Sequence, residues 1–153
     1  GQLKSDLEEE ADRLGIESQI ELVGSVPHEQ IHTEYEQADI FCLPSYHESH
    51  AIVNIEAMLS GVPVVSTNID AIQEYIEDRK TGFIVEPGDV NALSNTFRRL
   101  VDNPELRQKV GQSGREVAKR YTVEASVDRI ENIFKQVIAS PSGKNCPTEN
   151  THD

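Results

Sequence analysis

The stretch PSYHESHAIVNIEAMLSGVPVV, residues 44–65, decides the fold of this chain. It joins two short apolar runs, 39–43 and 62–66, whose composition is typical of strands buried on both faces of a parallel sheet. An acidic turn and a short helical segment lie between these two runs. They carry two carboxylates, Glu48 and Glu56, eight residues apart. This order of strand, turn, helix and strand predicts the edge of an open α/β sheet at which ligands bind.

The rest of the chain alternates in the same way. We expect helices over 4–14, 28–37, 51–60, 72–76, 89–101, 104–119 and 123–139, and strands over 19–24, 39–43, 62–66 and 82–85. Strands that alternate with helices form right-handed βαβ units, so the predicted fold class is α/β, a Rossmann-like parallel sheet flanked by helices with a helical C-terminal end. Residues 1–139 form this unit, and the Ser, Gly, Asn, Pro and Thr content of 140–153 predicts a disordered tail.

Composition excludes several classes of partner. The 153 residues carry 14 Lys and Arg against 27 Asp and Glu, a formal net charge of −13. Nucleic acids and anionic membranes need a positively charged surface, so neither is expected to bind. We expect no integral membrane segment and no signal peptide. Cys42 and Cys146 lie in an apolar strand and a polar tail, so we expect free thiols, a reducing compartment and a cytoplasmic localisation.

The spacing of Glu48 and Glu56 bears on their chemistry. On one continuous helix, the two residues would be separated by about 12 Å along the axis and by roughly 80° around it. That separation excludes a shared proton and suits two contacts along one elongated ligand. A carboxylate has two acceptor oxygens and matches a vicinal diol such as that of ribose or a hexose. The helix that follows Glu48 would also present free backbone amides, which suit a phosphate.

Other polar residues lie around this pair. His47 and His50 flank Glu48 and raise the alternative of a metal site. Such a site needs several converging ligands, so we expect no metal there, and His50 is instead a candidate contact to a sugar or phosphate. Thr67 and Asn68 end the next strand on the ligand side, where a contact to base or phosphate and a structural role are both open.

These residues resemble the signature of a known family. The series Ser45-x-x-Glu48-x7-Glu56-Ala57-Met58-x-x-Gly61-x-Pro63-Val64-Val65 is similar to the motif of retaining glycosyltransferases of family 4, which have the GT-B fold. An ordered series of this kind is specific, whereas two glutamates alone would be weak support. The resemblance implies the C-terminal, nucleotide-sugar-binding lobe. Further matching segments follow in order over most of the chain: Leu14-Gly15 to Val23-Gly24, Tyr35-x-x-Ala38-Asp39, Thr81-Gly82-Phe83-Ile84-Val85, Pro87-Gly88-Asp89, Asn103-Pro104-Glu105-Leu106-Arg107 and Gly111.

The resemblance also implies a reaction. A sugar would pass from a nucleotide-diphosphate sugar to a sugar, lipid or glycan acceptor with retention at the anomeric carbon. Glu48 would be the catalytic residue and would hold the transferred sugar's hydroxyls, and Glu56 would hold the ribose diol. Neither a metal nor a cofactor is implied, because helix dipoles and basic side chains stabilise the leaving diphosphate. The backbone amides that would meet sugar hydroxyls and the diphosphate belong to Ser49, His50, Ala51 and Ile52.

The chain departs from the family pattern in ways that bear on function. The family usually has Gly-Phe-Gly where this chain has Ser49-His50-Ala51, and these residues permit close backbone approach less freely than glycine does. The family's lobe also begins with a strand, a Gly-rich turn and an Arg and Lys segment that neutralises the diphosphate. None of these features precedes Gly1, so we expect the chain to be N-terminally truncated and inactive when isolated. Arg99 and Arg107 lie on later helices and are expected to be solvated charges.

Two alternatives to an active transferase stay open. One is a catalytically inactive nucleotide-sugar-binding fragment that needs a partner chain to supply the missing strands. The other is a nucleotide-sugar epimerase of the same fold, which uses similar donor contacts for different chemistry. In the transferase interpretation, the acceptor binds through the missing N-terminal lobe.

Overall fold

The computed structural model describes residues 2–139, and the predicted tail, 140–153 with Cys146, lies outside them. The central part of the chain alternates strands and helices, as the sequence predicts, and the C-terminal part is helical. The elements in order are α1 (Lys4–Leu14), η1 (Glu17–Gln19), α2 (His28–Gln37), β1 (Phe41–Leu43), α3 (Ile52–Leu59), β2 (Val64–Thr67), α4 (Asp70–Gln73), β3 (Phe83–Val85), α5 (Val90–Val101), α6 (Pro104–Ala118), η2 (Lys119–Tyr121) and α7 (Val123–Ala139).

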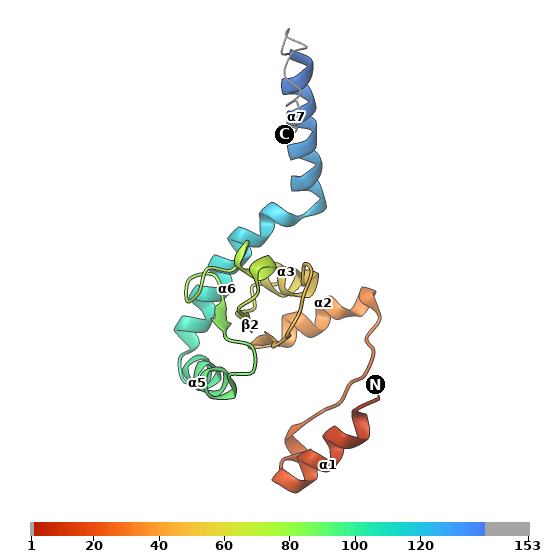
Figure 1. Ribbon diagram of the computed structural model, residues 1–153, viewed down its shortest axis with the longest axis vertical. Coiled ribbons are helices and arrows are strands. Elements are labelled where there is room, and N and C mark those ends of the chain that lie inside the picture. The colour runs from red at the N-terminus through yellow and green to blue at the C-terminus, as the bar shows by residue number, and fades with distance from the viewer. Residues whose placement is uncertain (1, 140–153) are drawn as a thin grey trace, which may run out of the picture.

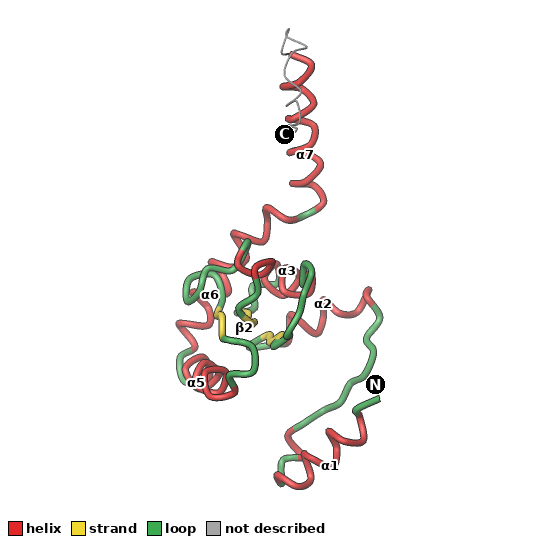
Figure 2. Tube along the Cα trace, in the orientation of Figure 1, coloured by secondary structure: helices red, strands yellow, loops and turns green. Residues whose placement is uncertain are grey.

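The sheet has the order β1-β2-β3, and both strand pairs are parallel, which confirms the predicted α/β class. Phe41 pairs with Val64 and Val65 pairs with Phe83. The strands lie in the middle of the main body, with helices around them (Figure 2). All of β2 is buried, because it is the central strand. Within residues 2–139 no further strand pairs with β1, so β1 forms an edge of the sheet.

Consecutive residues of β2 supply the two halves of the core. Val64 packs in a cluster with Met58 of α3 and Ile72 of α4, whereas Val65 packs with Leu100 of α5. Side chains alternate between the two faces of a strand, so the two clusters lie on opposite faces of the sheet. Helices therefore cover both faces, which is the reason that these strands are continuous apolar runs.

Two glycines of α6 allow this helix to lie against the turn that follows α3 and against the loop that precedes β3. A Cβ atom at Gly111 would stand 2.0 Å from the carbonyl oxygen of Gly61, and one at Gly114 would stand 2.7 Å from the carbonyl oxygen of Thr81. Only a residue without a side chain fits such an approach. Gly111 belongs to the family pattern, and the structure shows the packing reason for it.

Arg107 is not the solvated charge that the sequence suggested. Its guanidinium donates hydrogen bonds to the carbonyl oxygens of Leu100, at 2.7 Å, and Val101, at 3.0 Å. It also forms an ion pair with Asp39 at 3.3 Å, and its side chain is only 21% exposed. Arg107 thus binds two carbonyl oxygens at the end of α5, of which that of Leu100 also accepts from the backbone N–H of Asn103, and it joins this helix to α6. The guanidinium of Arg99 lies over the ring of Phe83, 5.8 Å from its centroid.

The strand predicted over 19–24 is wrong. This segment begins in η1 and continues without regular secondary structure, with Ile20 in an extended conformation but 44% exposed and Val23 56% exposed. Figure 1 shows α1 and this segment set apart from the main body, and Ala11 is the buried residue of α1. The apolar alternation is that of a strand, but a strand also needs a neighbouring backbone to pair with.

Helix α7 projects away from the body at the opposite end (Figure 1). Its apolar residues follow a helical period along one side, and none of the described residues of α7 is buried. The exposed stripe comprises Val123, Val127, Ile130, Ile133, Phe134, Val137 and Ile138. The helical C-terminal end that the sequence predicts is therefore present.

Candidate functional site

Glu48 lies in the loop between β1 and α3, before the helix begins at Ile52. The two carboxylates therefore do not share one continuous helix, and the helical estimate of their separation does not apply. The Ser45 hydroxyl donates a hydrogen bond to the Glu48 carboxylate at 2.8 Å. The Thr67 hydroxyl in turn donates to the Ser45 carbonyl oxygen at 2.5 Å, so the loop is attached to the end of β2. Thr67 thus has the structural role that the sequence left open.

Glu56 lies in the second turn of α3 and is partly buried. The Tyr35 hydroxyl of α2 donates a hydrogen bond to its Oε2 atom at 3.1 Å. Tyr35 is 4% exposed, and its ring packs edge-on against Phe41 with the centroids 5.5 Å apart. Burial, and then the adjacent Glu56 carboxylate, raise the pKa of Tyr35 to about 12. The phenol therefore stays protonated at neutral pH and holds one oxygen of Glu56 in place.

Sequence reasoning did not assign this role to Tyr35. Tyr35 belongs to the segment Tyr35-x-x-Ala38-Asp39 of the family pattern, but nothing in a helix of mostly polar residues indicates which side chain its tyrosine will contact. The contact joins residues 21 positions apart, and it exists only because α2 packs beside α3.

The start of α3 is open to solvent. Ala51 precedes the helix in a left-handed conformation, with φ 37° and ψ 54°, and among the described residues no side chain caps this end. Ser49 and His50 are exposed in the loop, and the side chain of Ile52 is 63% exposed. The first backbone N–H groups of a helix have no partner within it, so these amides are available to an anion. The structure therefore brings together Glu48, the loop amides and the helix start.

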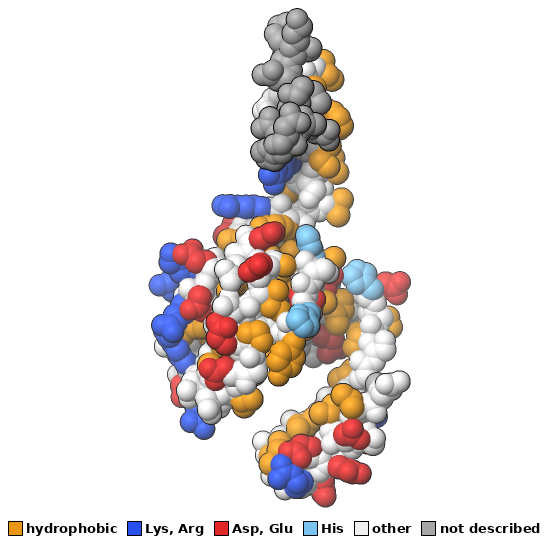
Figure 3. Space-filling view, in the orientation of Figure 1, with side chains coloured by type: hydrophobic (Ala, Val, Ile, Leu, Met, Phe, Trp, Pro, Cys, Tyr) orange, Lys and Arg blue, Asp and Glu red, His pale blue; other side chains and the backbone are white. Residues whose placement is uncertain are grey.

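The site has little positive charge of its own. No Lys or Arg occurs in residues 44–65. On the face shown in Figure 3, Lys and Arg side chains gather over the side formed by α5 and α6, whereas the histidines lie on another part of the face. In residues 2–139 no group of three or more His, Cys, Asp and Glu side chains is placed to hold a metal ion. His47 and His50 are both exposed.

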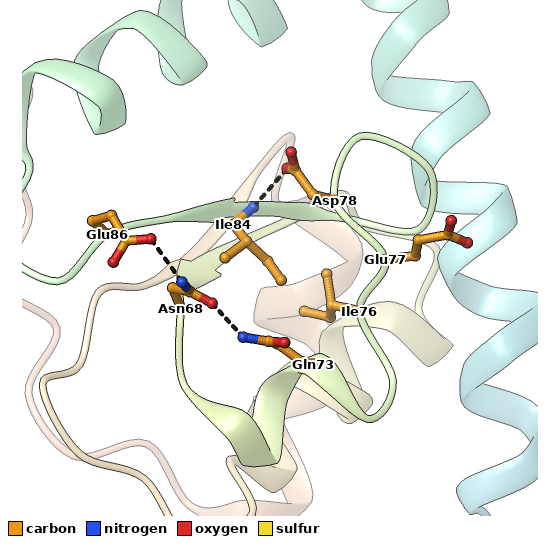
Figure 4. Close-up of a pocket in the computed structure, with 7 residues that line it drawn as sticks. All are labelled: Asn68, Gln73, Ile76, Glu77, Asp78, Ile84 and Glu86. Carbon is orange, nitrogen blue, oxygen red and sulfur yellow. Dashed lines mark hydrogen bonds between the residues drawn. The ribbon is translucent and has the colours of Figure 1, made fainter.

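A separate pocket of about 580 Å³ lies beside the ends of β2 and β3 (Figure 4). Asn68 donates to Glu86 at 2.6 Å and accepts from Gln73, so these side chains form a short hydrogen-bonded chain across it. The backbone N–H of Ile84 donates to Asp78 at 3.0 Å. Glu48 and Glu56 do not line this pocket. Both carboxylates are partly buried, Glu48 in the loop before α3 and Glu56 on α3 itself.

A parallel sheet whose central strand ends beside an acidic loop and an uncapped helix belongs to the open α/β class, in which ligands usually bind at this edge of the sheet. The family model described as glycosyl transferases group 1 matches residues 1–117. The chain belongs to this family. This result confirms the resemblance that the residues of the 44–65 stretch indicated, and with it the GT-B type of fold.

Curated relatives and solved structures support the same family and fold. The chain is 28% identical over 138 residues to the alpha-D-kanosaminyltransferase of Streptomyces kanamyceticus, covering 90% of this chain and 36% of that protein. Sucrose-phosphate synthase of Thermosynechococcus elongatus aligns with a TM-score of 0.79 and 28% identity, over 91% of this chain and 35% of that one. The C-terminal domain of a glycosyl transferase group 1 family protein of Francisella tularensis aligns with a TM-score of 0.73 and 27% identity, over 80% and 64%. The chain thus spans about a third of the length of the first two.

Within residues 2–139, the helices are too short or too polar for any of them to cross a bilayer.

Proposed function

We propose that this chain is the donor-binding part of a retaining glycosyltransferase that transfers a sugar from a nucleotide-diphosphate sugar to an acceptor. One observation carries the proposal: in a member of the glycosyl transferases group 1 family, an acidic loop, an uncapped helix start and a second carboxylate held by a buried tyrosine lie around α3. The acceptor, a sugar, a lipid or a glycan, would bind to a second lobe outside this chain. The free thiol of Cys42 fits a reducing compartment, and we propose that the protein acts in the cytoplasm.

The two carboxylates have different roles in this proposal. Glu56 accepts hydrogen bonds from the ribose diol, because Tyr35 occupies only part of the acceptor capacity of its carboxylate. Glu48 accepts from hydroxyls of the transferred sugar and acts as the catalytic residue, with Ser45 fixing the direction of its carboxylate.

The diphosphate would lie at the start of α3. Its charge would be met by the backbone amides of Ser49, His50, Ala51 and Ile52 and by the positive end of the helix dipole. Loss of one such stabilising donor typically costs about 3 kcal/mol in a transition state. Because residues 44–65 hold no Lys or Arg, we expect the cations that complete the site to come from outside this stretch. Neither a metal nor a cofactor takes part in the proposed reaction.

A titration of the 153-residue chain, followed residue by residue in an amide NMR spectrum, tests donor binding. UDP, GDP and ADP are the probes, each compared with its 2′,3′-dideoxy form. We expect one of the three nucleotides to shift the signals of residues 48–56. Removal of its ribose hydroxyls should lower its affinity about tenfold, which is the usual contribution of a charge-assisted hydrogen bond. Glu56→Gln should remove that difference.

Glu105→Gln, on the outer surface of α6, is the matched control and should leave the preference for ribose unchanged. If none of the three nucleotides shifts residues 48–56, the donor-binding proposal is wrong. If a nucleotide binds but the dideoxy form binds equally well, the role of Glu56 is wrong and the rest of the proposal stands.

A second candidate is a nucleotide-sugar-binding fragment that is inactive until a partner chain completes it. The open edge of β1 and the absence of Lys and Arg from residues 44–65 favour this interpretation. It predicts nucleotide binding in the titration above, without any hydrolysis or transfer of the bound UDP-, GDP- or ADP-sugar by the chain alone. Turnover by the isolated chain would exclude it.

A further inference from the structure

Ala51 has a backbone conformation that residues other than glycine rarely adopt. Its φ of 37° lies in the left-handed region, and the residue is buried. This is the position at which the resembling family usually has a glycine. A strained residue of this kind persists only where the surrounding structure determines its conformation. Some neighbouring group must therefore hold the Ala51 turn.

A buried polar network lies directly behind this turn. Asn54 is fully buried, and its Nδ2 atom donates to the Ser66 hydroxyl at 3.2 Å and to the Tyr75 hydroxyl at 3.1 Å. The Ser66 hydroxyl in turn donates a hydrogen bond to the carbonyl oxygen of Leu43, at 3.0 Å. The carbonyl oxygen of Ala51 accepts from the backbone N–H of Asn54 at 2.8 Å, and the Tyr75 hydroxyl lies 3.5 Å from the same oxygen, a long hydrogen bond within the buried network. The network thus connects the strand ends to the strained residue.

Asn54 makes its side-chain contacts through its Nδ2 atom. The Oδ1 atom of Asn54 is buried and has no hydrogen-bond partner among the described residues. A buried polar atom without a partner is costly, and an apolar side chain at position 54 would avoid that cost. The amide is therefore accounted for by the two hydroxyls that its Nδ2 atom holds, those of Ser66 and Tyr75.

We propose that Tyr75 is a positioning residue, which together with Asn54 holds Ala51 in the left-handed conformation and so fixes the backbone amides of Ser49–Ile52. The inference rests on the proposed function in one respect, because these are the amides assigned to the diphosphate. Burial raises the pKa of Tyr75; the Asn54 hydrogen bond lowers it, and the nearby charge of Glu48 raises it again. The net shift is upward, so the phenol keeps its proton and can donate to the Ala51 carbonyl.

The proposal makes a specific prediction about coupling. With glycine at position 51 the left-handed conformation carries no steric cost, so the tyrosine hydroxyl is no longer needed to hold it. Tyr75→Phe, Ala51→Gly and the double variant form a cycle that measures this dependence. Tyr121→Phe is the matched control, since its ring lies edge-on to Tyr75 and its hydroxyl donates to the Glu74 carbonyl oxygen, outside the network.

Hydrogen exchange of the Asn54 amide, which donates to the carbonyl oxygen of Ala51 at 2.8 Å, is the first readout, measured in the 153-residue chain without ligand. We expect Tyr75→Phe to speed exchange there about tenfold, Ala51→Gly to leave it near the wild-type rate, and the double variant to return to that rate. Tyr121→Phe should not change it. Equal acceleration by Tyr75→Phe with alanine and with glycine at position 51, or no acceleration in either background, would overturn the proposal.

Titration of the same variants with UDP, GDP and ADP is the second readout, and affinity should follow the same order. If no nucleotide binds any variant while the exchange rates remain coupled, the proposed function fails and the positioning role stands. If Tyr75→Phe does not fold, the double variant decides: recovery of the folded spectrum when Ala51→Gly is added supports the proposal, and continued unfolding overturns it.

Discussion

At the scale of single residues, the burial of Tyr35, together with the adjacent Glu56 carboxylate, makes stability depend on pH in the alkaline range. The pKa of Tyr35 rises from 10.0 to about 12 on folding, so the folded state keeps a proton that the unfolded state releases. This contribution to stability is fully present below pH 10 and is lost as the pH rises towards 12. Urea unfolding of the wild type between about pH 9 and 11.5 should therefore show a steeper loss of stability than that of Tyr35→Phe, whose curve serves as the baseline. Parallel curves would contradict the raised pKa of Tyr35.

A second prediction at this scale concerns Ala51. Relief of a left-handed alanine is worth about 1–3 kcal/mol, whereas the greater freedom of glycine in the unfolded chain costs about 0.5–1 kcal/mol. The first effect is the larger, so Ala51→Gly should raise the free energy of unfolding by about 1 kcal/mol. Urea denaturation with unchanged m-value checks this. If Ala51→Gly is instead destabilised, the Cβ atom of Ala51 causes no steric strain in the left-handed conformation, and this prediction is wrong.

At the scale of elements, the contact between α6 and the turn after α3 depends on Gly111. A methyl group there would lie 2.0 Å from the Gly61 carbonyl oxygen, which is backbone and cannot rotate away. Overpacking of this kind typically costs about 1–3 kcal/mol or more, so we expect Gly111→Ala to lower the free energy of unfolding by about 3 kcal/mol. Gln112→Ala, exposed on the same helix, is the control and should change it by less than about 0.5 kcal/mol. Equal stability of the two variants in thermal unfolding would show that α6 can shift to accept the methyl group.

At the scale of the whole molecule, the parts set apart from the body should open most readily. Helix α1 buries only Ala11, and α7 buries none of its described residues, whereas β2 and α3 lie in the core. Local stability follows buried contact, so amides of α1 and α7 should exchange at least about a hundredfold faster than those of α3 and β2. Hydrogen exchange read by mass spectrometry on the full chain measures this. Protection of α1 equal to that of α3 would contradict the arrangement of Figure 1.

Local signals in the sequence were enough for the central βαβ part. The apolar runs at 39–43 and 62–66, with a helix stop between them, placed β1, α3 and β2 within a few residues of their bounds. Asp89 and Asn103 mark helix starts because their side chains accept from the backbone N–H groups of Ala92 and Leu106. Such signals act over one turn of chain and need no distant partner.

Predictions from local signals were wrong where a residue distant in the sequence determines the structure. Residues 19–24 have the alternation of a strand, yet a strand forms only beside another backbone, and the described chain offers none there. Arg107 was expected to be solvated, because its sequence neighbours do not reveal that α5 ends within its reach.

The sequence by itself determined the class of fold, the family, and the loop and helix that carry Glu48 and Glu56. Periodicity, helix caps and an ordered motif are local properties, so they can be recognised in the sequence without a structure. Only the tertiary structure decided that Tyr35 holds Glu56, that Tyr75 and Asn54 stand behind Ala51, and that Gly111 makes room for a backbone carbonyl. These contacts join residues far apart along the chain. Their partners are chosen by how helices pack on the sheet, which no local pattern specifies.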